Sequence, residues 1–404
     1  MDGGGRLRVL HSFPHKIGAD RICGIAWQQA AGAASAGADV TVYARAVARP
    51  LPANVDTRTT LERGRLRLPY PVLKRRTLHL HDAIVARILP RIAAEVDVVH
   101  VWPQGALRTL RAARALGIPT VLERPNAHTR FAYRVVQDEC RRLGVELPAD
   151  HEHAYNESIL RLEEEEFALA DFLLCPSEFV VRTFLDEGFP PDKLIRHTYG
   201  FDPEAFEPGE PSSDGGLRML YVGVAAVRKG LHFALDAWLA SPASATGTFS
   251  IAGGFVPDYE ALLAPKLAHP SVRALGHRTD VPELMRSSDI LVLPSIEEGY
   301  GLVCAEAMGS GCVPVVSDAC TDLCRHMENA LVHPAGDVAT LQQHITLLER
   351  DRELLAQLRA GALASVPEAT WEHAGRVLVG AYELARERGG SRPAAAVPAA
   401  AGAP

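Results

Sequence analysis

Short apolar runs rich in Val, Ile and Leu alternate with longer helical patterns along almost the whole chain. Strands that are apolar at nearly every position are typical of parallel sheets, which helices cover on both faces. The alternation therefore predicts an α/β fold built on parallel sheets. The predicted strands are LRVLHSF, DVTVYA, DVVHVW, PTVLE and DFLLCPS in the first half and LRMLYVG, GTFSIAGG, SVRALG, DILVLPS and VPVVS in the second. The predicted helices lie near 20–37, 78–95, 104–116, 154–170, 337–360 and 370–387.

The two series of strands are separated by HTYGFDPEAFEPGEPSSDGG, whose Pro, Gly, Asp and Ser are typical of a linker. A chain of 404 residues is also too long for one ordinary core. We therefore expect two doubly wound Rossmann-like domains, 1–203 and 204–370, that face each other across a cleft. A helix at 371–388 could cross back to the first domain. The Ala- and Pro-rich tail at 389–404 is expected to be disordered.

Composition narrows the classes of partner. A net charge of -7 argues against nucleic acid as the main partner. The start of the chain lacks a secretory pattern, and there is no run of 18 apolar residues, so we expect no integral membrane segment and a cytoplasmic location. The seven cysteines lack zinc-site spacing and are expected to be reduced thiols without metal. The basic stretch at 62–87 is either a plain surface or a peripheral contact with a membrane or an anionic acceptor.

The stretch EEGYGLVCAEA directly follows a predicted strand, where doubly wound folds bind ligands. Buried carboxylates are costly without hydrogen-bond partners, and a ligand rich in hydroxyl groups would supply such partners to Glu298 and Glu306. Gly299 and Gly301 would let the loop approach a ligand closely, and a helix that begins near Leu302 would offer free N–H groups to a phosphate. The alternative is that Glu298 is solvated and Glu306 only caps a helix.

Another basic segment follows a strand in YVGVAAVRKGLHFALDAW. Arg228 and Lys229 stand just before the helix, where their charge and the helix dipole would both favour a diphosphate. A purely solvated basic pair is less favourable there, because its charge opposes the dipole. We therefore expect this loop to bind an anion.

Two segments of the first half are further candidates for ligand contacts. The first turn, SFPHKIGADRICG, is not GxGxxG, which argues against a dinucleotide-dependent dehydrogenase. Within it, Lys16 and Arg21 are either acceptor or phosphate contacts or simply solvated. After PTVLE we expect a polar, aromatic loop with His128, and with Arg130 and Tyr133 as candidate acceptor contacts.

The run PSIEEGYGLVCAEAMGSGCVPVVSD resembles the donor-site pattern of retaining GT-B glycosyltransferases of family 4. In that pattern Pro-Ser is followed by Glu-Gly-(Phe/Tyr)-Gly, Glu-Ala-Met, a Gly and Pro-Val-Val. The two glutamates of the family pattern fall on Glu298 and Glu306. The resemblance implies that Glu298 holds sugar hydroxyls and Glu306 binds the donor ribose. It also implies donor contacts at Gly299, Tyr300, Gly301 and Leu302.

The resemblance extends over residues 6–387 and is more specific in the carboxyl-terminal half. The family has Gly-Arg after the strand and Lys-Gly later in this loop. Gly223 and Lys229 match, but Val224 stands where the arginine is expected, and Arg228 could replace it. Further donor contacts implied by the resemblance are Gly18 at the phosphate, His128 at the sugar, and His277 and Arg278 at the nucleobase.

The function implied by the resemblance is transfer of a sugar from a nucleoside diphosphate donor, of the UDP or GDP type, to a hydroxyl acceptor such as a small molecule or natural product, with no other cofactor. Lys229 and Arg228 would stabilise the departing diphosphate, and His128 and Glu298 would orient the sugar. No Asp-x-Asp occurs in the sequence, which favours a metal-independent reaction. An epimerase or phosphorylase on the same fold, or a non-catalytic nucleotide-sugar binding protein, stays open.

Overall fold

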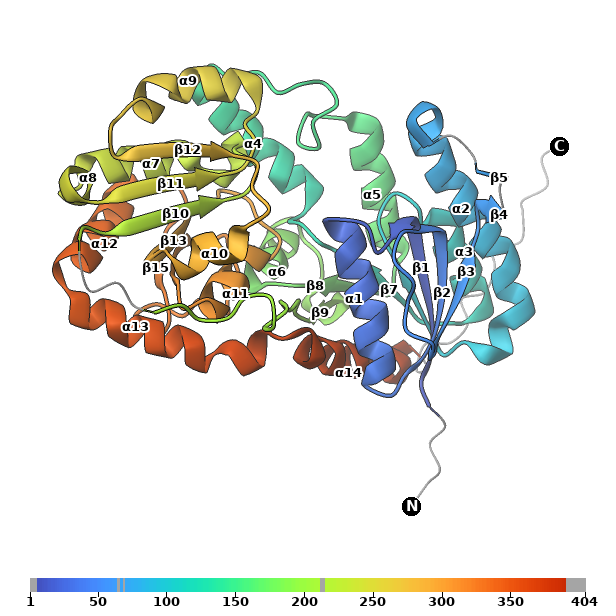
Figure 1. The fold of residues 1–404 in the computed structure, drawn as a ribbon. Helices are drawn as coiled ribbons and strands as arrows, with labels where there is room; N and C mark the ends of the chain where they lie inside the picture. Colours follow the sequence, from blue (N-terminus) through green and yellow to red (C-terminus); the bar gives the residue numbers. More distant parts are fainter. Residues whose placement is uncertain (1–5, 64–65, 68–69, 211–214, 390–404) are drawn as a thin grey trace.

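The computed structural model describes residues 6–63, 66–67, 70–210 and 215–389, without the side chains of 63–75. Two parallel sheets occupy separate halves of the molecule, and helices pack on both faces of each sheet (Figure 1). The predicted fold class of two doubly wound α/β domains is confirmed.

The amino-terminal sheet has seven parallel strands in the order β3-β2-β1-β6-β7-β8-β9. The order reverses between β1 and β6, which is the switch point of a doubly wound sheet. β6, β7 and β8 are buried at every position, including the polar residues His100, Thr120 and Glu123. The strands are β1 (Arg8–Ile17), β2 (Asp39–Val47), β3 (Val55–Thr59), β6 (Val98–Val101), β7 (Thr120–Glu123), β8 (Phe172–Cys175) and β9 (Leu194–Arg196), while β4 (Glu62–Arg63) and β5 (Leu66–Arg67) form a separate antiparallel pair.

The carboxyl-terminal sheet has six parallel strands in the order β12-β11-β10-β13-β14-β15. Its switch point lies between β10 and β13, so the loops that follow these two strands meet at the same edge. β13 and β14 are buried at every position. The strands are β10 (Arg218–Val222), β11 (Thr248–Ala252), β12 (Val272–Gly276), β13 (Ile290–Leu293), β14 (Val313–Ser317) and β15 (Leu331–His333).

The helices differ from the predicted ones at two places. The segment after β7, expected to be a loop, begins the helix α4, and the single helix expected at 337–360 is divided at Asp351, whose carboxylate caps the second part. The helices of the first half are α1 (Ile22–Ser35), α2 (Tyr70–Ile92), α3 (Leu107–Leu116), α4 (Thr129–Leu143), α5 (Glu157–Leu169) and α6 (Glu178–Asp186). Those of the second half are α7 (Leu231–Ala240), α8 (Ala243–Thr246), α9 (Pro257–Leu267), α10 (Val281–Arg286), α11 (Leu302–Gly309), α12 (Val338–Arg350), α13 (Arg352–Ala364) and α14 (Trp371–Gly389).

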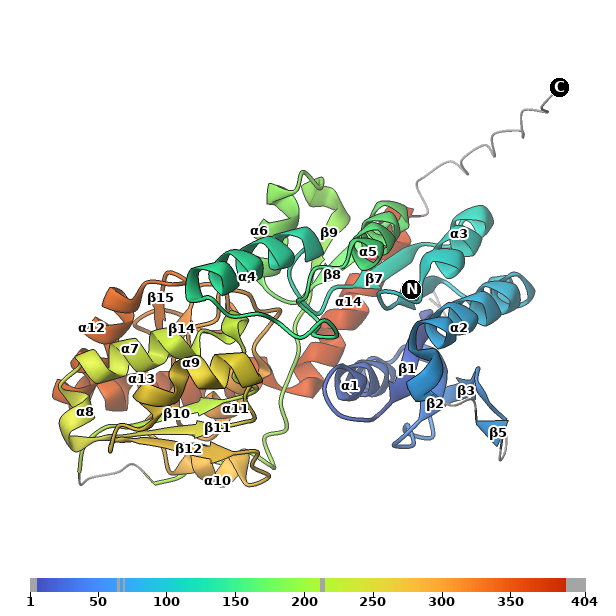
Figure 2. The same ribbon diagram turned by 90° about the horizontal axis from the view of Figure 1, so that it is seen from above.

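The last helix, α14, packs against α1 of the amino-terminal half (Figure 2). Gly375 makes this approach possible, because a Cβ there would lie 2.5 Å from the backbone oxygen of Gly32. Farther along α14 the hydroxyl of Tyr382 lies 2.7 Å from His100 Nδ1 on β6, in the core of the first half. The end of the chain therefore belongs structurally to the half in which the chain begins.

Helix α4 makes the opposite crossing, from the amino-terminal half onto the carboxyl-terminal one (Figures 1 and 2). Its residues Val136 and Cys140 are buried in one core cluster with the strands and helices of the second sheet. At its end Glu139 accepts a hydrogen bond from His232 Nε2 on α7, over 2.7 Å. Each half of the chain therefore contributes one helix that packs on the other half. The predicted domain limits stay predictions.

Several expectations concern features other than the sheets. The predicted disordered tail lies outside the described residues from 390 onward. None of the helices in the described part of the chain has the length and apolar character needed to cross a bilayer. All seven cysteines are free thiols.

Candidate functional site

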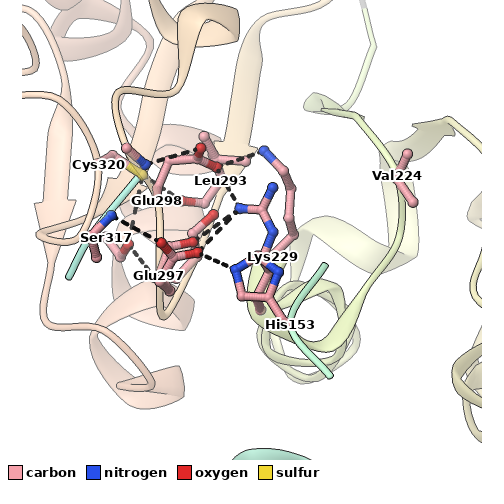
Figure 3. Close-up of polar contacts among 12 residues, drawn as sticks. His153, Val224, Lys229, Leu293, Glu297, Glu298, Ser317 and Cys320 are labelled. Atoms are coloured by element: carbon pink, nitrogen blue, oxygen red, sulfur yellow. Dashed lines mark hydrogen bonds and ion pairs between the residues drawn. The ribbon is translucent and has the colours of Figure 1, made fainter. Parts of the chain in front are cut away.

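The switch point of the carboxyl-terminal sheet brings the two loops with predicted site residues together (Figure 3). After β10 the chain forms a single 3₁₀ turn that ends at Lys229, and after β13 it reaches Glu298. Lys229 Nζ donates to Glu298 Oε2 over 2.6 Å. Gly223 lies beside the lysine with a φ of 138°, a backbone conformation that favours glycine. The two loops therefore meet at this edge of the sheet through the ion pair of Lys229 with Glu298.

Arg228 lies in the same cluster. Its Nη1 is 3.2 Å from the backbone oxygen of Glu297 and 3.5 Å from Glu298 Oε2. Glu152 Oε1 is 3.6 Å from the other guanidinium nitrogen, Nη2. Burial alone would lower the pKa of Arg228. The carboxylates of Glu298, Glu297 and Glu152 outweigh this effect and raise the pKa. Val224, at the position of the expected arginine, is 45% exposed and lies apart from the cluster (Figure 3).

Glu298 is a buried carboxylate with cationic partners. Burial alone would raise its pKa, but Lys229 and Arg228 lower it, so the group stays ionised. Without a ligand, Lys229 and Glu298 largely neutralise each other.

Glu306 lies one turn into α11 and is half-buried. Burial raises the pKa of its carboxyl to about 7, and the opposing effect of Lys229 is smaller. Among the described residues no donor is hydrogen-bonded to this carboxylate, so hydroxyl groups of a ligand could be its partners. Gly301 precedes the helix with a φ of 74° and no side-chain cap, which leaves the first N–H groups of α11 available.

The loop before α11 has partners within the chain itself. Gly299 packs closely against the first half: a Cβ there would lie 1.6 Å from the backbone oxygen of Pro125, and its own carbonyl accepts from Ser177 Oγ over 2.6 Å. The Tyr300 ring is buried, and its hydroxyl is 3.1 Å from the backbone oxygen of Tyr199. Both residues contact the first half of the chain, and their expected donor contacts stay predictions. Leu302 is half-buried at the first position of α11.

His128 does not lie in this cluster, and its expected contact with the donor sugar finds no support in the structure. Its ring is 1% exposed and packs against Phe167, Phe184 and Phe189, with ring centroids 4.9 to 5.5 Å away. Its Nδ1 accepts from the N–H of Arg130 and so caps α4. Burial, together with the smaller effect of the nearby arginines, lowers the pKa of His128 to about 3. The residue is a neutral helix cap in an aromatic core.

The candidate acceptor residues have different surroundings. Lys16 is exposed near the end of β1, and Arg21 is exposed in the turn that follows. Arg130 donates from Nε to Glu164 over 2.9 Å, and Tyr133 is buried against Tyr155. Arg130 and Tyr133 therefore take part in the packing of α4, and their acceptor role stays a prediction.

The remaining donor candidates follow two strands: Gly18 follows β1, and His277 and Arg278 follow β12. Gly18 has a φ of 77°, and a Cβ there would lie 2.7 Å from Arg49 Cβ, so glycine is required by the turn itself. His277 and Arg278 are exposed in the loop after β12, where Arg278 donates to Asp280 over 2.8 Å. Their contacts with a ligand stay predictions.

Two functional candidates were missed in the sequence. Glu297 is completely buried, and its Oε2 accepts from His153 Nε2 over 3.0 Å. The two consecutive glutamates before Gly299 could have indicated a role for Glu297, because a second buried carboxylate at this place needs its own hydrogen-bond donor. His153 lies in the irregular segment PADHEHAYN, where no periodicity marks it.

Within the described ranges, no three His, Cys, Asp or Glu side chains are arranged to hold a metal ion. At the switch point, Lys229, Arg228 and the N–H groups of α11 can each interact favourably with an anion.

Comparison with protein families gives two matches, one in each half. Residues 25–205 match the model of Glycosyltransferase Family 4. Residues 216–351 match the model of Glycosyl transferases group 1. The two matched regions meet near the linker. The second region contains Arg228, Lys229 and Glu298.

Curated relatives share shorter segments. A D-inositol 3-phosphate glycosyltransferase of Geodermatophilus obscurus is 27% identical over 262 residues, which is 58% of this chain and 57% of that protein. An O-antigen chain mannosyltransferase B of Escherichia coli is 34% identical over 116 residues, 28% of this chain and 30% of the relative. Another D-inositol 3-phosphate glycosyltransferase, of Jonesia denitrificans, is 29% identical over 111 residues, 27% of this chain and 26% of the relative. The chain therefore matches from about a quarter to somewhat over half of the length of these relatives.

Solved structures resemble the whole chain at low identity. HepE of Anabaena in complex with UDP has a TM-score of 0.64 and 17% identity, and covers 93% of this chain and 100% of its own. Sucrose-phosphate synthase of Thermosynechococcus elongatus has a TM-score of 0.68 and 18% identity, over 94% and 98% of the two chains. At such identity these likenesses show the fold, two parallel-sheet domains in the GT-B arrangement.

Proposed function

This chain belongs to the family 4, or group 1, glycosyltransferases, and we propose that it transfers a sugar from a nucleoside diphosphate sugar to a hydroxyl acceptor with retention of configuration. The observation that carries the proposal is the cluster of Lys229, Arg228 and Glu298 at the switch point, beside the start of α11. Such an arrangement offers cations and free N–H groups to a diphosphate, and carboxylates to sugar hydroxyls.

The donor would lie across the two loops. Its diphosphate would take Lys229 as a partner in place of Glu298, and the released carboxylate would accept from sugar hydroxyls. Glu306 would accept from the ribose, because its carboxylate has no hydrogen-bond donor among the described residues and lies one turn from the free N–H groups. Structures of HepE with UDP and with UDP-glucose support a UDP-type donor, and a GDP-type donor is the alternative.

In the proposed reaction the acceptor oxygen forms a bond to the anomeric carbon while the bond from that carbon to the diphosphate oxygen breaks. The acceptor proton passes to the leaving diphosphate, which departs from the same face. Negative charge grows on the diphosphate in the transition state, so Lys229 and Arg228 contribute most at that moment. Protein cations would supply this stabilisation without a divalent metal.

The test is to measure release of free nucleoside diphosphate from UDP-glucose and GDP-mannose, with and without hydroxyl acceptors. A transferase makes the release depend on the acceptor. An epimerase changes the sugar without releasing nucleotide, a phosphorylase needs phosphate, and a binding protein releases none. Lys229→Ala serves as the matched control for release caused by a contaminating enzyme. Release of nucleoside diphosphate that does not change when an acceptor is added, with every sugar nucleotide, would contradict the proposal.

A further inference from the structure

Residues 129–156, here called the arm, comprise α4 and the segment that links it to α5. The arm leaves the first sheet after β7 and packs on the second half, with Val136 and Cys140 in the core cluster of that half (Figure 1). Glu139 accepts from His232 Nε2 over 2.7 Å, which fixes the far end of α4. The segment after α4 then returns along the switch-point loops.

On this return His153 reaches the donor loop. The His153 side chain is 4% exposed, and its Nε2 donates to Glu297 Oε2 over 3.0 Å (Figure 3). The other carboxylate oxygen of Glu297 accepts from the N–H of Ala127 over 3.2 Å, just before the arm begins. Glu297 of the second half is thus held by His153 of the arm and by Ala127, which lies two residues before the arm.

Glu297 is ionised in this setting. Complete burial would raise its pKa, but His153, Arg228 and the N–H of Ala127 together lower it to about 2. A buried carboxylate without such partners would be strongly unfavourable, so these contacts keep a fixed negative charge beside the site.

That charge lies next to Arg228. Arg228 Nη1 is 3.6 Å from Glu297 Oε2 and 3.2 Å from the backbone oxygen of Glu297. Glu152, also on the arm, is 3.6 Å from the guanidinium. Arginine has a long side chain with many rotamers, and a cation stabilises a transition state best when it is already held in place. The arm supplies two of the carboxylate contacts of Arg228, one directly through Glu152 and one through the Glu297 that His153 holds.

We propose that the arm, through His153 and Glu297, positions Arg228 in the donor site, so that Glu297 and His153 are positioning residues for the leaving diphosphate. This inference rests on the proposed function. A purely structural role for Glu297 would lower stability in the same way whether or not Arg228 is present. A positioning role makes the effect of Glu297 on turnover depend on Arg228.

The first experiment is a double-mutant cycle with UDP-glucose as the probe. Glu297→Gln and Arg228→Ala are measured singly and together, for kcat and for donor KM. We expect Glu297→Gln to lower kcat at least tenfold with less than a threefold change in KM, and to have less than a twofold effect in the Arg228→Ala background. Equal losses of kcat in both backgrounds would overturn the proposal.

The second experiment does not need turnover. Hydrogen–deuterium exchange of the ligand-free protein is followed in the peptides that cover 225–231 and 148–156. Glu297→Gln and His153→Ala are both expected to increase exchange in both peptides. Faster exchange confined to 148–156 would show that the arm does not hold the Arg228 turn. If wild type releases no nucleotide from any sugar nucleotide, the proposed function fails, while this measurement still decides whether the arm fixes Arg228.

The matched control is another ion pair between the two halves. Asp322 pairs with Arg196 over 2.7 Å, with half-exposed side chains and no contact to Arg228. Asp322→Asn is therefore expected to leave kcat and exchange in 225–231 unchanged. His153→Ala is the second kinetic variant in case Glu297→Gln lowers the yield of folded protein, and it is expected to show the same dependence on Arg228.

Discussion

Lys229 and Glu298 form an ion pair of 2.6 Å between the two loops of the switch point, with side chains 14% and 10% exposed. In the ligand-free protein each group satisfies the other. A diphosphate that takes the lysine also frees the carboxylate, so binding of the leaving group and of the sugar are linked through one ion pair.

We expect Lys229→Ala to lower turnover more than it weakens donor binding. The contact of Lys229 with the diphosphate strengthens as charge grows on the leaving group, so its loss acts mainly on the transition state. Loss of one preorganised partner costs about 3 to 4 kcal/mol, roughly a hundredfold to a thousandfold in rate. Steady-state kinetics measure kcat and KM. Near-normal kcat with a raised donor KM would leave Lys229 as a simple binding contact.

The Lys229 variant should be non-additive with Arg228→Ala. The two cations share the carboxylate of Glu298, and each can partly cover for the other once one is removed. Comparing both single variants with the double variant measures this coupling.

Glu306 should make donor binding depend on pH. Its carboxyl has a pKa of about 7 in the free protein, and ribose hydroxyls donate more strongly to the ionised form than to the protonated one. Affinity for UDP-glucose is therefore expected to rise about three- to tenfold from pH 6 to pH 8. Isothermal titration at several pH values measures it, with Glu306→Gln as the control that loses both affinity and pH dependence. Unchanged affinity in that variant would contradict the ribose assignment.

The reaction should continue without divalent metal. If Lys229, Arg228 and the N–H groups of α11 neutralise the diphosphate, excess EDTA should leave most of the rate intact. The measurement compares initial rates with and without chelator. Complete loss that magnesium or manganese restores would show that a metal shares this role.

His128→Ala should lower stability and not turnover. The change removes the cap of α4 and leaves a cavity among three phenylalanine rings. We expect a loss of about 2 to 4 kcal/mol in the free energy of unfolding. Thermal unfolding and the kcat of the folded fraction separate the two effects. A stable variant without turnover would restore the sugar contact first expected for His128.

Glu166 should make stability fall as pH rises. Burial raises the pKa of its carboxyl to about 8 from an ordinary value of 4.5, although the N–H groups of Gln104 and Ala106 act in the opposite direction. Stability from this group is complete below pH 4.5 and is lost as the pH rises through 8. Between pH 6 and pH 8 the wild type should lose about 1 to 3 kcal/mol relative to Glu166→Gln. Denaturant unfolding at both values measures it, and parallel curves would contradict the raised pKa.

The sheets were predictable because their signal is local. Strands such as β13 and β14 are apolar at nearly every position, and the residues after them mark the edge where ligands bind. The ion pair of Lys229 with Glu298 was not predicted, because it joins two loops whose contact appears only in the folded chain.

The loops were harder, because their side chains can face either a ligand or the other half of the chain. Gly299 and Tyr300 have the residue types of a ligand loop, yet Pro125 and Tyr199 are their partners. Only the folded arrangement decides between these possibilities. His153 shows the same limit from the other side, because it becomes a site residue through α4, a helix the sequence did not reveal.

The exchange of α4 and α14 between the halves has a consequence for protein engineering. A chimera joined at the linker near residue 204 would place α4 of one parent on the second core of another, and α14 of the second parent on the first core. Both contacts depend on fitted surfaces, such as the approach of Gly375 to Gly32. A hybrid that keeps each core intact has to take α4 from the parent of the carboxyl-terminal half and α14 from the parent of the amino-terminal half.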